Sequence, residues 1–202
     1  MAEPLNIHQQ QLRDRILTHA FSKFTQKGIK NVKMDDIAAE LQMSKRTLYS
    51  MFADKESLLL ECLKYHNELR SKDVEAIADS AQNPLDAYVK VYELKIKEIH
   101  DINPLFFSEA KRYASVIEYV HQETVRRDAN MMRFIQACLD EGLLRDDLDY
   151  RLLVRVFNLL GKSVMENELY KDFPMESILS TMSQAFLMGL CTDKGKRILN
   201  KQ

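Results

Sequence analysis

Glycine, proline and cysteine are scarce in this chain, and tryptophan is missing altogether. The 202 residues include 5 Gly, 4 Pro and 3 Cys, whereas ordinary usage of roughly 7% Gly and 5% Pro would give about 24 Gly and Pro together. So few helix-breaking residues predict a mostly helical protein. Five glycines also leave no phosphate-binding loop and no dinucleotide-binding fingerprint.

The cysteines and the charge balance exclude further classes. Cys62, Cys138 and Cys191 are widely spaced without a paired C-x-x-C motif, which indicates neither a disulfide framework nor a structural zinc site. With 29 Lys plus Arg against 30 Asp plus Glu, the formal charge of −1 excludes a histone-like polycation, so any contact with nucleic acid must be local. The polar first eleven residues and the lack of an apolar run near the roughly 18 residues of a membrane span predict a cytoplasmic protein with no membrane partner.

The few breakers divide the chain into segments with the 3.6-residue periodicity of amphipathic helices. Asn83-Pro84 and Asn103-Pro104 are typical helix starts, and Gly28 stands where a left-handed C-cap is expected. We therefore expect an all-α fold with helices at about Gln9–Lys27, Met34–Leu41, Lys45–Met51, Lys55–Ala81, Leu85–Ile102, Pro104–Arg112, Ser115–Asp140, Tyr150–Tyr170 and Pro174–Leu190.

Met34 to Met51 has the pattern of a helix, a tight turn and a second helix. Ser44 is a good N-cap for the second helix, and a basic, hydrogen-bonding first turn follows it directly. In a helix-turn-helix the start of the second helix faces base edges in the major groove, while other polar groups hold phosphates. The side chains expected to contact DNA are Lys33, Ser44, Lys45, Arg46, Thr47, Tyr49, Ser50 and Lys55.

Charge divides near the same place. Residues 1–56 carry 9 Lys or Arg and 7 Asp or Glu, a balance of +2, and the remainder carries −3. The sign favours the N-terminal part as the end that faces a polyanion. We expect a helix-turn-helix DNA-binding domain at 1–54 and a helical effector-binding and dimerisation domain at 55–202.

These residues carry a family resemblance. The chain resembles the N-terminal signature of the TetR family of bacterial transcriptional regulators at Ile16-Leu17, Ala20, Phe24, Gly28, Ile37-Ala38, Ser44, Thr47-Leu48-Tyr49, Phe52, Lys55-Glu56 and Leu58. The resemblance implies a homodimer with a three-helix DNA-binding domain and a larger C-terminal domain that binds a small effector. From this resemblance we expect neither an enzyme nor a bound cofactor. We favour a repressor over an activator, because blocking a promoter requires only occupancy.

Three positions depart from the family's usual pattern. Lys33 replaces the Thr that often caps the second helix, which removes a side-chain cap. Gln42 stands where the turn usually has Gly, so either Gln42 adopts a left-handed conformation or the turn differs. Met51 replaces an aromatic or His residue and removes one phosphate donor.

The C-terminal part predicts a dimer and an effector pocket. The segment from Tyr150 to Val164 is apolar on nearly every side, so it must be buried against a partner. We expect a four-helix interface across a two-fold axis, formed by Leu153, Val156, Phe157, Leu160, Val164, Ile178, Met182, Ala185, Phe186 and Gly189. The side chains expected to line a mainly apolar effector pocket are His66, Tyr88, Tyr92, Phe106, Phe107, Tyr119, Met131 and Phe134.

Two other classes of function remain open. Glu118 and His121 have the Glu-x-x-His spacing of helical di-iron enzymes, but such a site requires two of these pairs. Cys62 and His66 lie one helical turn apart, where core packing is the simpler interpretation and no metal site is expected. The second alternative to a regulator is a helical dimer that binds a protein partner and has lost DNA binding.

Overall fold

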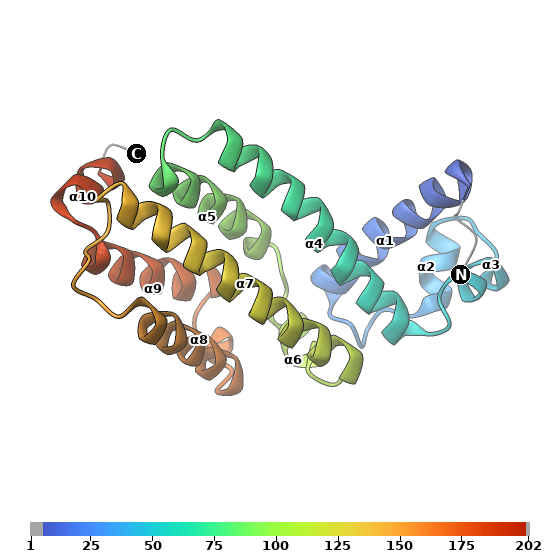
Figure 1. Cartoon of the computed structure of the whole chain (residues 1–202). Coiled ribbons are helices and arrows are strands. Elements are labelled where there is room, and N and C mark those ends of the chain that lie inside the picture. Colours follow the sequence, from blue (N-terminus) through green and yellow to red (C-terminus); the bar gives the residue numbers. More distant parts are fainter. Residues whose placement is uncertain (1–5, 201–202) are drawn as a thin grey trace. The chain divides into compact units, whose positions relative to one another are not determined.

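A computed structural model describes residues 6–200, and the first five residues of the polar N-terminal segment lie outside that range. The described part contains ten α-helices, one short 3-10 helix and a single isolated antiparallel bridge between Leu144 and Cys191 (Figure 1). The predicted all-α fold is confirmed. None of the described helices is both long enough and apolar enough to cross a bilayer.

The helices follow the predicted order. They are α1 (Ile7–Lys27), α2 (Met34–Glu40), α3 (Lys45–Met51), α4 (Lys55–Ser80), α5 (Pro84–His100), α6 (Pro104–Ala110), α7 (Ala114–Asp140), α8 (Tyr150–Glu166), the 3-10 helix η1 (Leu169–Lys171), α9 (Met175–Leu190) and α10 (Asp193–Leu199).

Side-chain caps explain most of the helix starts. Asn83 and Asn103 each accept a backbone hydrogen bond ahead of a proline at the first helical position, as their sequence predicts. Asn6 forms a reciprocal capping box with Gln9, so α1 begins two residues before its expected start. α10 was not predicted, although Thr192 gives it a cap by accepting from the Gly195 N–H.

The predicted helix at Tyr150–Tyr170 is wrong at its C-terminal end. α8 ends at Glu166, and Glu168 adopts the left-handed conformation with φ 52° before the 3-10 turn at Leu169–Lys171. A left-handed residue interrupts the ladder of helical hydrogen bonds, so the helix cannot continue through it.

The chain packs as two compact units. One comprises Met1–Lys72 with Ile102–Val120, and the other comprises Asp73–Asp101 with His121–Gln202. Thus α6 and the start of α7 pack with the N-terminal helices, although residues 73–101, which belong to the other unit, separate the two segments in the sequence. The domain boundary expected after residue 54 remains a proposal about which part contacts DNA.

Each unit has its own hydrophobic core. In the first unit, α1, α2, α3 and the start of α4 bury a set that includes Ile16, Leu17, Phe24, Ile37, Leu48, Phe52, Leu58 and Phe106. In the second, the core includes Leu85, Ile135, Cys138, Leu143, Leu144, Tyr150 and Cys191. All three cysteines are free and buried.

Two glycines with positive φ give a test of local strain. Gly28 (φ 80°, ψ 156°) ends α1, and a Cβ there would lie 3.1 Å from both Glu109 Oε2 and Leu105 Cβ. Gly142 (φ 64°) has open space around it. We predict that Gly28→Ala lowers the free energy of unfolding by about 2–3 kcal/mol, since its backbone region suits only glycine. Gly142→Ala should cost about 1 kcal/mol. Urea unfolding measures both, and equal losses would contradict the role given to Gly28.

Candidate nucleic-acid interface

The α2–turn–α3 segment forms the expected helix-turn-helix. The turn closes through backbone hydrogen bonds from Gln42 N to Ala39 O (3.0 Å) and from Met43 N to Ala38 O (2.9 Å). Gln42, although not a glycine, adopts the left-handed conformation that the turn requires at this position, with φ 54°. The turn therefore keeps its geometry at a cost of about 1–2 kcal/mol.

Ser44 fixes the start of α3. Its Oγ accepts a hydrogen bond from Thr47 N at 3.0 Å and lies 2.8 Å from Thr47 Oγ1. The cap satisfies one of the unpaired N–H groups of the first turn. Thr47, one of the expected DNA contacts, is half-buried, and its hydroxyl lies within hydrogen-bond distance of the Ser44 hydroxyl.

Burial on one side of α3 decides which side chains face outward. Leu48 is fully buried and Phe52, just beyond the helix, is 2% exposed. At 3.6 residues per turn, Arg46 lies about 160° around the helix from Leu48. Arg46 is exposed and makes no hydrogen bond or ion pair within residues 6–200, and Tyr49 is 45% exposed. The outward face of α3 therefore carries a free guanidinium and a phenol.

Lys45 is exposed but paired. Its Nζ lies 2.5 Å from Asp35 Oδ2 of α2, and its side chain remains 64% exposed. The hydrogen bond to Asp35 raises the pKa of Lys45, so the ammonium is charged at neutral pH. A phosphate would compete with Asp35 for this group.

Lys33 and Ser50 stand at the two ends of the motif. Lys33 is exposed at the N-cap position of α2, where no side-chain cap is formed, as its sequence predicts. Ser50 is exposed, and its Oγ donates to Thr47 O at 2.8 Å. Both side chains are accessible to a ligand along the outer edge of the motif.

Lys55 differs from the expectation of a phosphate contact. Its Nζ donates to the carbonyl oxygens of Ile29 (2.9 Å) and Val32 (2.9 Å), with a longer contact to Lys30 O at 3.4 Å. Burial lowers the pKa of Lys55, and the nearby Glu109 carboxylate raises it. The ammonium thus holds the turn between α1 and α2, and a phosphate would compete with these carbonyl oxygens for it.

No sequence pattern indicated the ion pairs and hydrogen bonds between α1 and α2. Glu40 accepts from Lys23 Nζ at 2.6 Å and lies 2.7 Å from His19 Nε2. The hydrogen bond from Lys23 lowers the pKa of Glu40. Because these partners are about 20 residues apart, only the folded structure brings them together.

Comparisons with known proteins decide the family. The model for "Bacterial regulatory proteins, tetR family" matches residues 16–62, which span α1 to the start of α4. Residues 16–62 form a TetR-family domain. The chain is a transcriptional regulator with an N-terminal helix-turn-helix and a C-terminal helical domain.

The similarity extends past the matched segment. The transcriptional repressor KstR2 of Mycolicibacterium smegmatis is 26% identical over 148 residues, 71% of this chain and 72% of the relative. The transcriptional regulator TcmR of Streptomyces glaucescens is 23% identical, over 86% of this chain and 79% of the relative. A putative regulator from Saccharomonospora viridis, solved with choline, shares the fold with a TM-score of 0.71 at 20% identity, covering 91% of this chain and 100% of that one.

The expected effector residues of this regulator fall into two groups. Phe106 is a buried core residue that meets Phe107 edge to face, and His66 stacks on Phe21 at 3.7 Å. Tyr119 Oη accepts from Asn67 Nδ2 at 2.6 Å. All of these belong to the first unit.

The second group lies in the other unit. Tyr88 stacks on Phe134 at 5.2 Å and on Tyr92 at 6.2 Å, while Met131 packs against the same core. Burial raises the pKa of both tyrosines, so their phenols stay neutral. Each group is aromatic and closely packed, and a pocket shared by all eight residues remains a prediction.

The surroundings of Cys62, Glu118 and His121 bear on the enzyme alternative. Cys62 is buried and its Sγ–H donates to Leu17 O at 3.4 Å, consistent with core packing. Glu118 and His121 are both exposed. Among residues 6–200, no group of three or more His, Cys, Asp or Glu side chains is placed to hold a metal ion.

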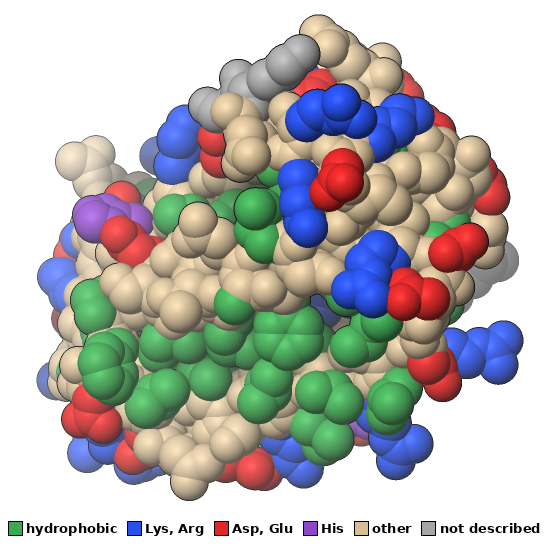
Figure 2. Space-filling model, turned by 90° about the vertical axis from the view of Figure 1, so that its left-hand side faces the viewer, with side chains coloured by type: hydrophobic (Ala, Val, Ile, Leu, Met, Phe, Trp, Pro, Cys, Tyr) green, Lys and Arg blue, Asp and Glu red, His purple; other side chains and the backbone are tan. Residues whose placement is uncertain are grey.

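The expected dimer residues lie on α8 and α9, and most of them are half-buried within the single chain. Figure 2 shows a band of hydrophobic side chains on the face of the second unit where α8 and α9 lie, with charged groups above and below the band. Phe157 of α8 meets Phe186 of α9 edge to face at 5.5 Å. Leu160 is 40% exposed, whereas Ile178 is buried within the single chain.

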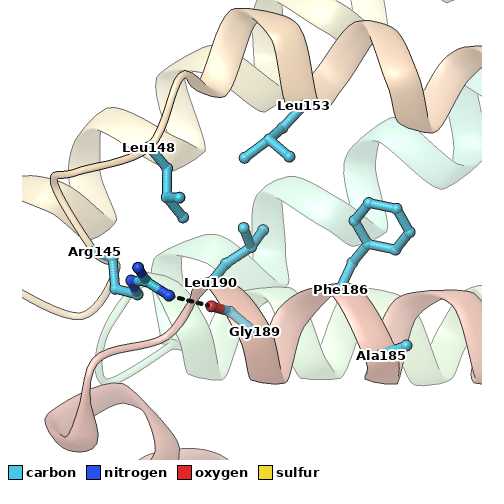
Figure 3. A pocket seen from close by; sticks show the side chains of 7 residues that line it. All are labelled: Arg145, Leu148, Leu153, Ala185, Phe186, Gly189 and Leu190. Atoms are coloured by element: carbon cyan, nitrogen blue, oxygen red, sulfur yellow. Dashed lines mark hydrogen bonds between the residues drawn. The ribbon is translucent and has the colours of Figure 1, made fainter.

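An open hollow of about 310 Å³ lies within this face. Leu153 and Leu148 approach it from one side and Phe186 and Leu190 from the other, and Arg145 reaches the Gly189 carbonyl at its rim (Figure 3). The four expected interface residues on the hollow are Leu153, Ala185, Phe186 and Gly189. The remaining expected interface residues, Val156, Val164 and Met182, are half-buried.

The Ser44 cap can be tested by removing its oxygen. We predict that Ser44→Ala lowers the free energy of unfolding by about 1 kcal/mol, because the Thr47 N–H loses its acceptor. Ser50→Ala is the matched control, and it should change stability by less than about 0.5 kcal/mol, since it removes only a side-chain donor from a helix carbonyl. Urea unfolding followed by circular dichroism measures both. Equal effects would contradict the capping role.

Proposed function

We propose that this chain is a homodimeric repressor that binds an inverted-repeat operator through α3 and is released by a small, mainly apolar effector. The observation that carries the proposal is the outward face of α3, where Arg46 and Tyr49 are exposed beside a capped helix start. A regulator of this kind acts where the DNA is, and we propose the cytoplasm as its compartment. Relatives named as repressors support the direction of control.

The proposed DNA contacts divide into two kinds. Arg46, with a free planar guanidinium at the start of α3, suits bidentate recognition of a guanine edge in the major groove. Lys33, Tyr49 and Ser50 suit phosphate oxygens along the rim. Lys45 is available only if it leaves Asp35, so its contribution includes the cost of breaking that exposed ion pair.

Dimerisation would present α3 twice. The exposed apolar side chains of α8, with Leu152 and Leu159 57% and 58% exposed, give a second copy a surface to cover. Two recognition helices related by a two-fold axis must enter major grooves about 34–36 Å apart, or a multiple of that distance. The operator is therefore an inverted repeat.

The chemistry of the effector is proposed only by class. The stacked Tyr88, Tyr92 and Phe134 offer apolar surface with phenol groups. One structure of the same fold holds choline, and another is titled a ketosteroid transcriptional regulator. For release, the effector must bind the two conformations unequally; a coupling of about 1–3 kcal/mol would weaken DNA binding by roughly 5- to 150-fold.

A second candidate is a helical dimer that binds a protein partner and has lost DNA binding. Two observations favour this candidate, because they occupy cations that would otherwise bind phosphate. Lys45 is paired with Asp35, and Lys55 donates to backbone carbonyls. Salt dependence separates the two functions. Binding to DNA phosphates weakens steeply as salt rises.

The first test uses the operator that the wild-type chain selects from a random duplex pool. We predict that Arg46→Ala weakens binding to this operator by roughly 10- to 100-fold and relaxes discrimination at one or two base pairs, because a bidentate base contact is lost. Lys72→Ala removes an exposed positive charge from α4 without a described partner, and its binding should match the wild type. Failure of the wild type to bind any duplex in a salt-dependent way would favour the second candidate.

The dimer face has its own test. We predict that Leu160→Glu raises the dimer dissociation constant by at least about 100-fold, since two carboxylates would be buried at the interface. Leu69→Glu is the control, because Leu69 of α4 is similarly exposed at 38% and lies outside the proposed face. Sedimentation equilibrium measures both variants. A dimer that tolerates Leu160→Glu as well as Leu69→Glu would place the interface elsewhere.

A further inference from the structure

The short turn between α1 and α2 is held from two sides by charged groups. Lys55, the first residue of α4, donates to the carbonyls of Ile29 and Val32. The Glu109 carboxylate of α6 accepts a hydrogen bond from the Lys30 backbone N–H at 2.6 Å. Thus a cation donates hydrogen bonds to carbonyl oxygens of the turn, and an anion accepts one from an N–H of the same turn.

The Glu109 side chain is buried against this turn. It is 9% exposed, although carboxylates are rarely buried without partners, and it lies close enough to Lys55 to raise the pKa of that ammonium. Gly28 leaves room for it, because a Cβ there would lie 3.1 Å from Glu109 Oε2. Asn103, just before α6, adds hydrogen bonds from its N to Thr25 O (2.8 Å) and from its Nδ2 to Gln26 O (3.2 Å).

The position of this turn matters for α3. The turn leads directly into α2, whose buried residues Met34, Ile37 and Ala38 share one core with Leu48 of α3. Because a close-packed core transmits small displacements, a shift of the turn would change the direction in which α3 presents its outer face.

We propose that Lys55 and Glu109 are positioning residues that hold the α1–α2 turn, and through it α3, in the DNA-binding orientation, and that Lys55 is not a phosphate ligand. This inference rests on the proposed DNA-binding function. Each side chain holds backbone groups of the same turn by hydrogen bonds, so removing either one leaves polar groups of the turn without that partner. Loss of either residue therefore reduces the fraction of molecules competent to bind the operator.

The salt dependence of operator binding distinguishes positioning from phosphate contact. A lost phosphate contact lowers the slope of log affinity against log salt by about 0.9. A reduced competent fraction weakens binding by the same factor at every salt concentration and leaves that slope unchanged.

The experiment measures binding of the selected operator from 50 to 300 mM salt for the full-length wild type, Lys55→Gln, Glu109→Gln and the double variant. We expect each single variant to bind about 5- to 20-fold more weakly with an unchanged slope. The double variant should lose less than the product of the two single losses, since both act on one turn. Glu68→Gln is the matched control, because Glu68 is exposed on α4 and has no described partner.

Two results would overturn the inference. One is a lower slope for Lys55→Gln together with wild-type binding by Glu109→Gln, which would make Lys55 a phosphate ligand. The other is wild-type binding by both single variants. If the wild type selects no operator, the proposed function fails instead.

A measurement on the wild type covers the case in which a variant does not fold. Amide hydrogen exchange should show the Lys30 N–H protected in the free protein, and more strongly protected when the operator is bound. An unprotected Lys30 N–H in both states would show that Glu109 does not hold the turn.

Discussion

The burial of Leu48 is the constraint on which the site depends. Leu48 and Phe52 pack into the core formed by α1, α2 and α4, and their burial sets the rotation of α3 about its own axis. A short helix of seven residues has little stability of its own, so its orientation comes from this packing. Arg46 faces outward because Leu48 faces inward. The hydrophobic effect thus positions the polar chemistry of the site.

Hydrogen bonds and ion pairs also position α3 and the elements around it. The Ser44 cap starts α3, Glu40 ties α2 to α1 through Lys23, and Lys55 and Glu109 hold the preceding turn. Exposed ion pairs such as that of Glu40 contribute little to stability individually. Their effect is geometric, since each restricts the relative position of two elements in the same unit. Lys45 belongs to this set through Asp35, whereas the exposed Arg46 guanidinium has no partner among residues 6–200 and is available to a ligand.

Local patterns predicted the helices well and the ion pairs poorly. The bounds of α3 follow from Ser44 and the apolar spacing around Leu48, and the left-handed Gln42 follows from the demands of the turn. The role of Lys55 did not follow, because its carbonyl partners lie more than 20 residues away. Glu109 gave no signal, since its partner is a backbone N–H about 80 residues distant. Such contacts depend on tertiary packing. The sequence could not separate aromatic residues that line a pocket from those of the core, because both have the same periodicity.

The central claim is that two symmetric copies present α3 to one duplex at a fixed separation. The most direct test measures the affinity for the selected inverted repeat before and after five base pairs are inserted between its half-sites. Five base pairs turn one half-site by about half a helical turn, so a rigid dimer should bind the lengthened site at least about 100-fold more weakly. Equal affinity for the two spacings would contradict the account.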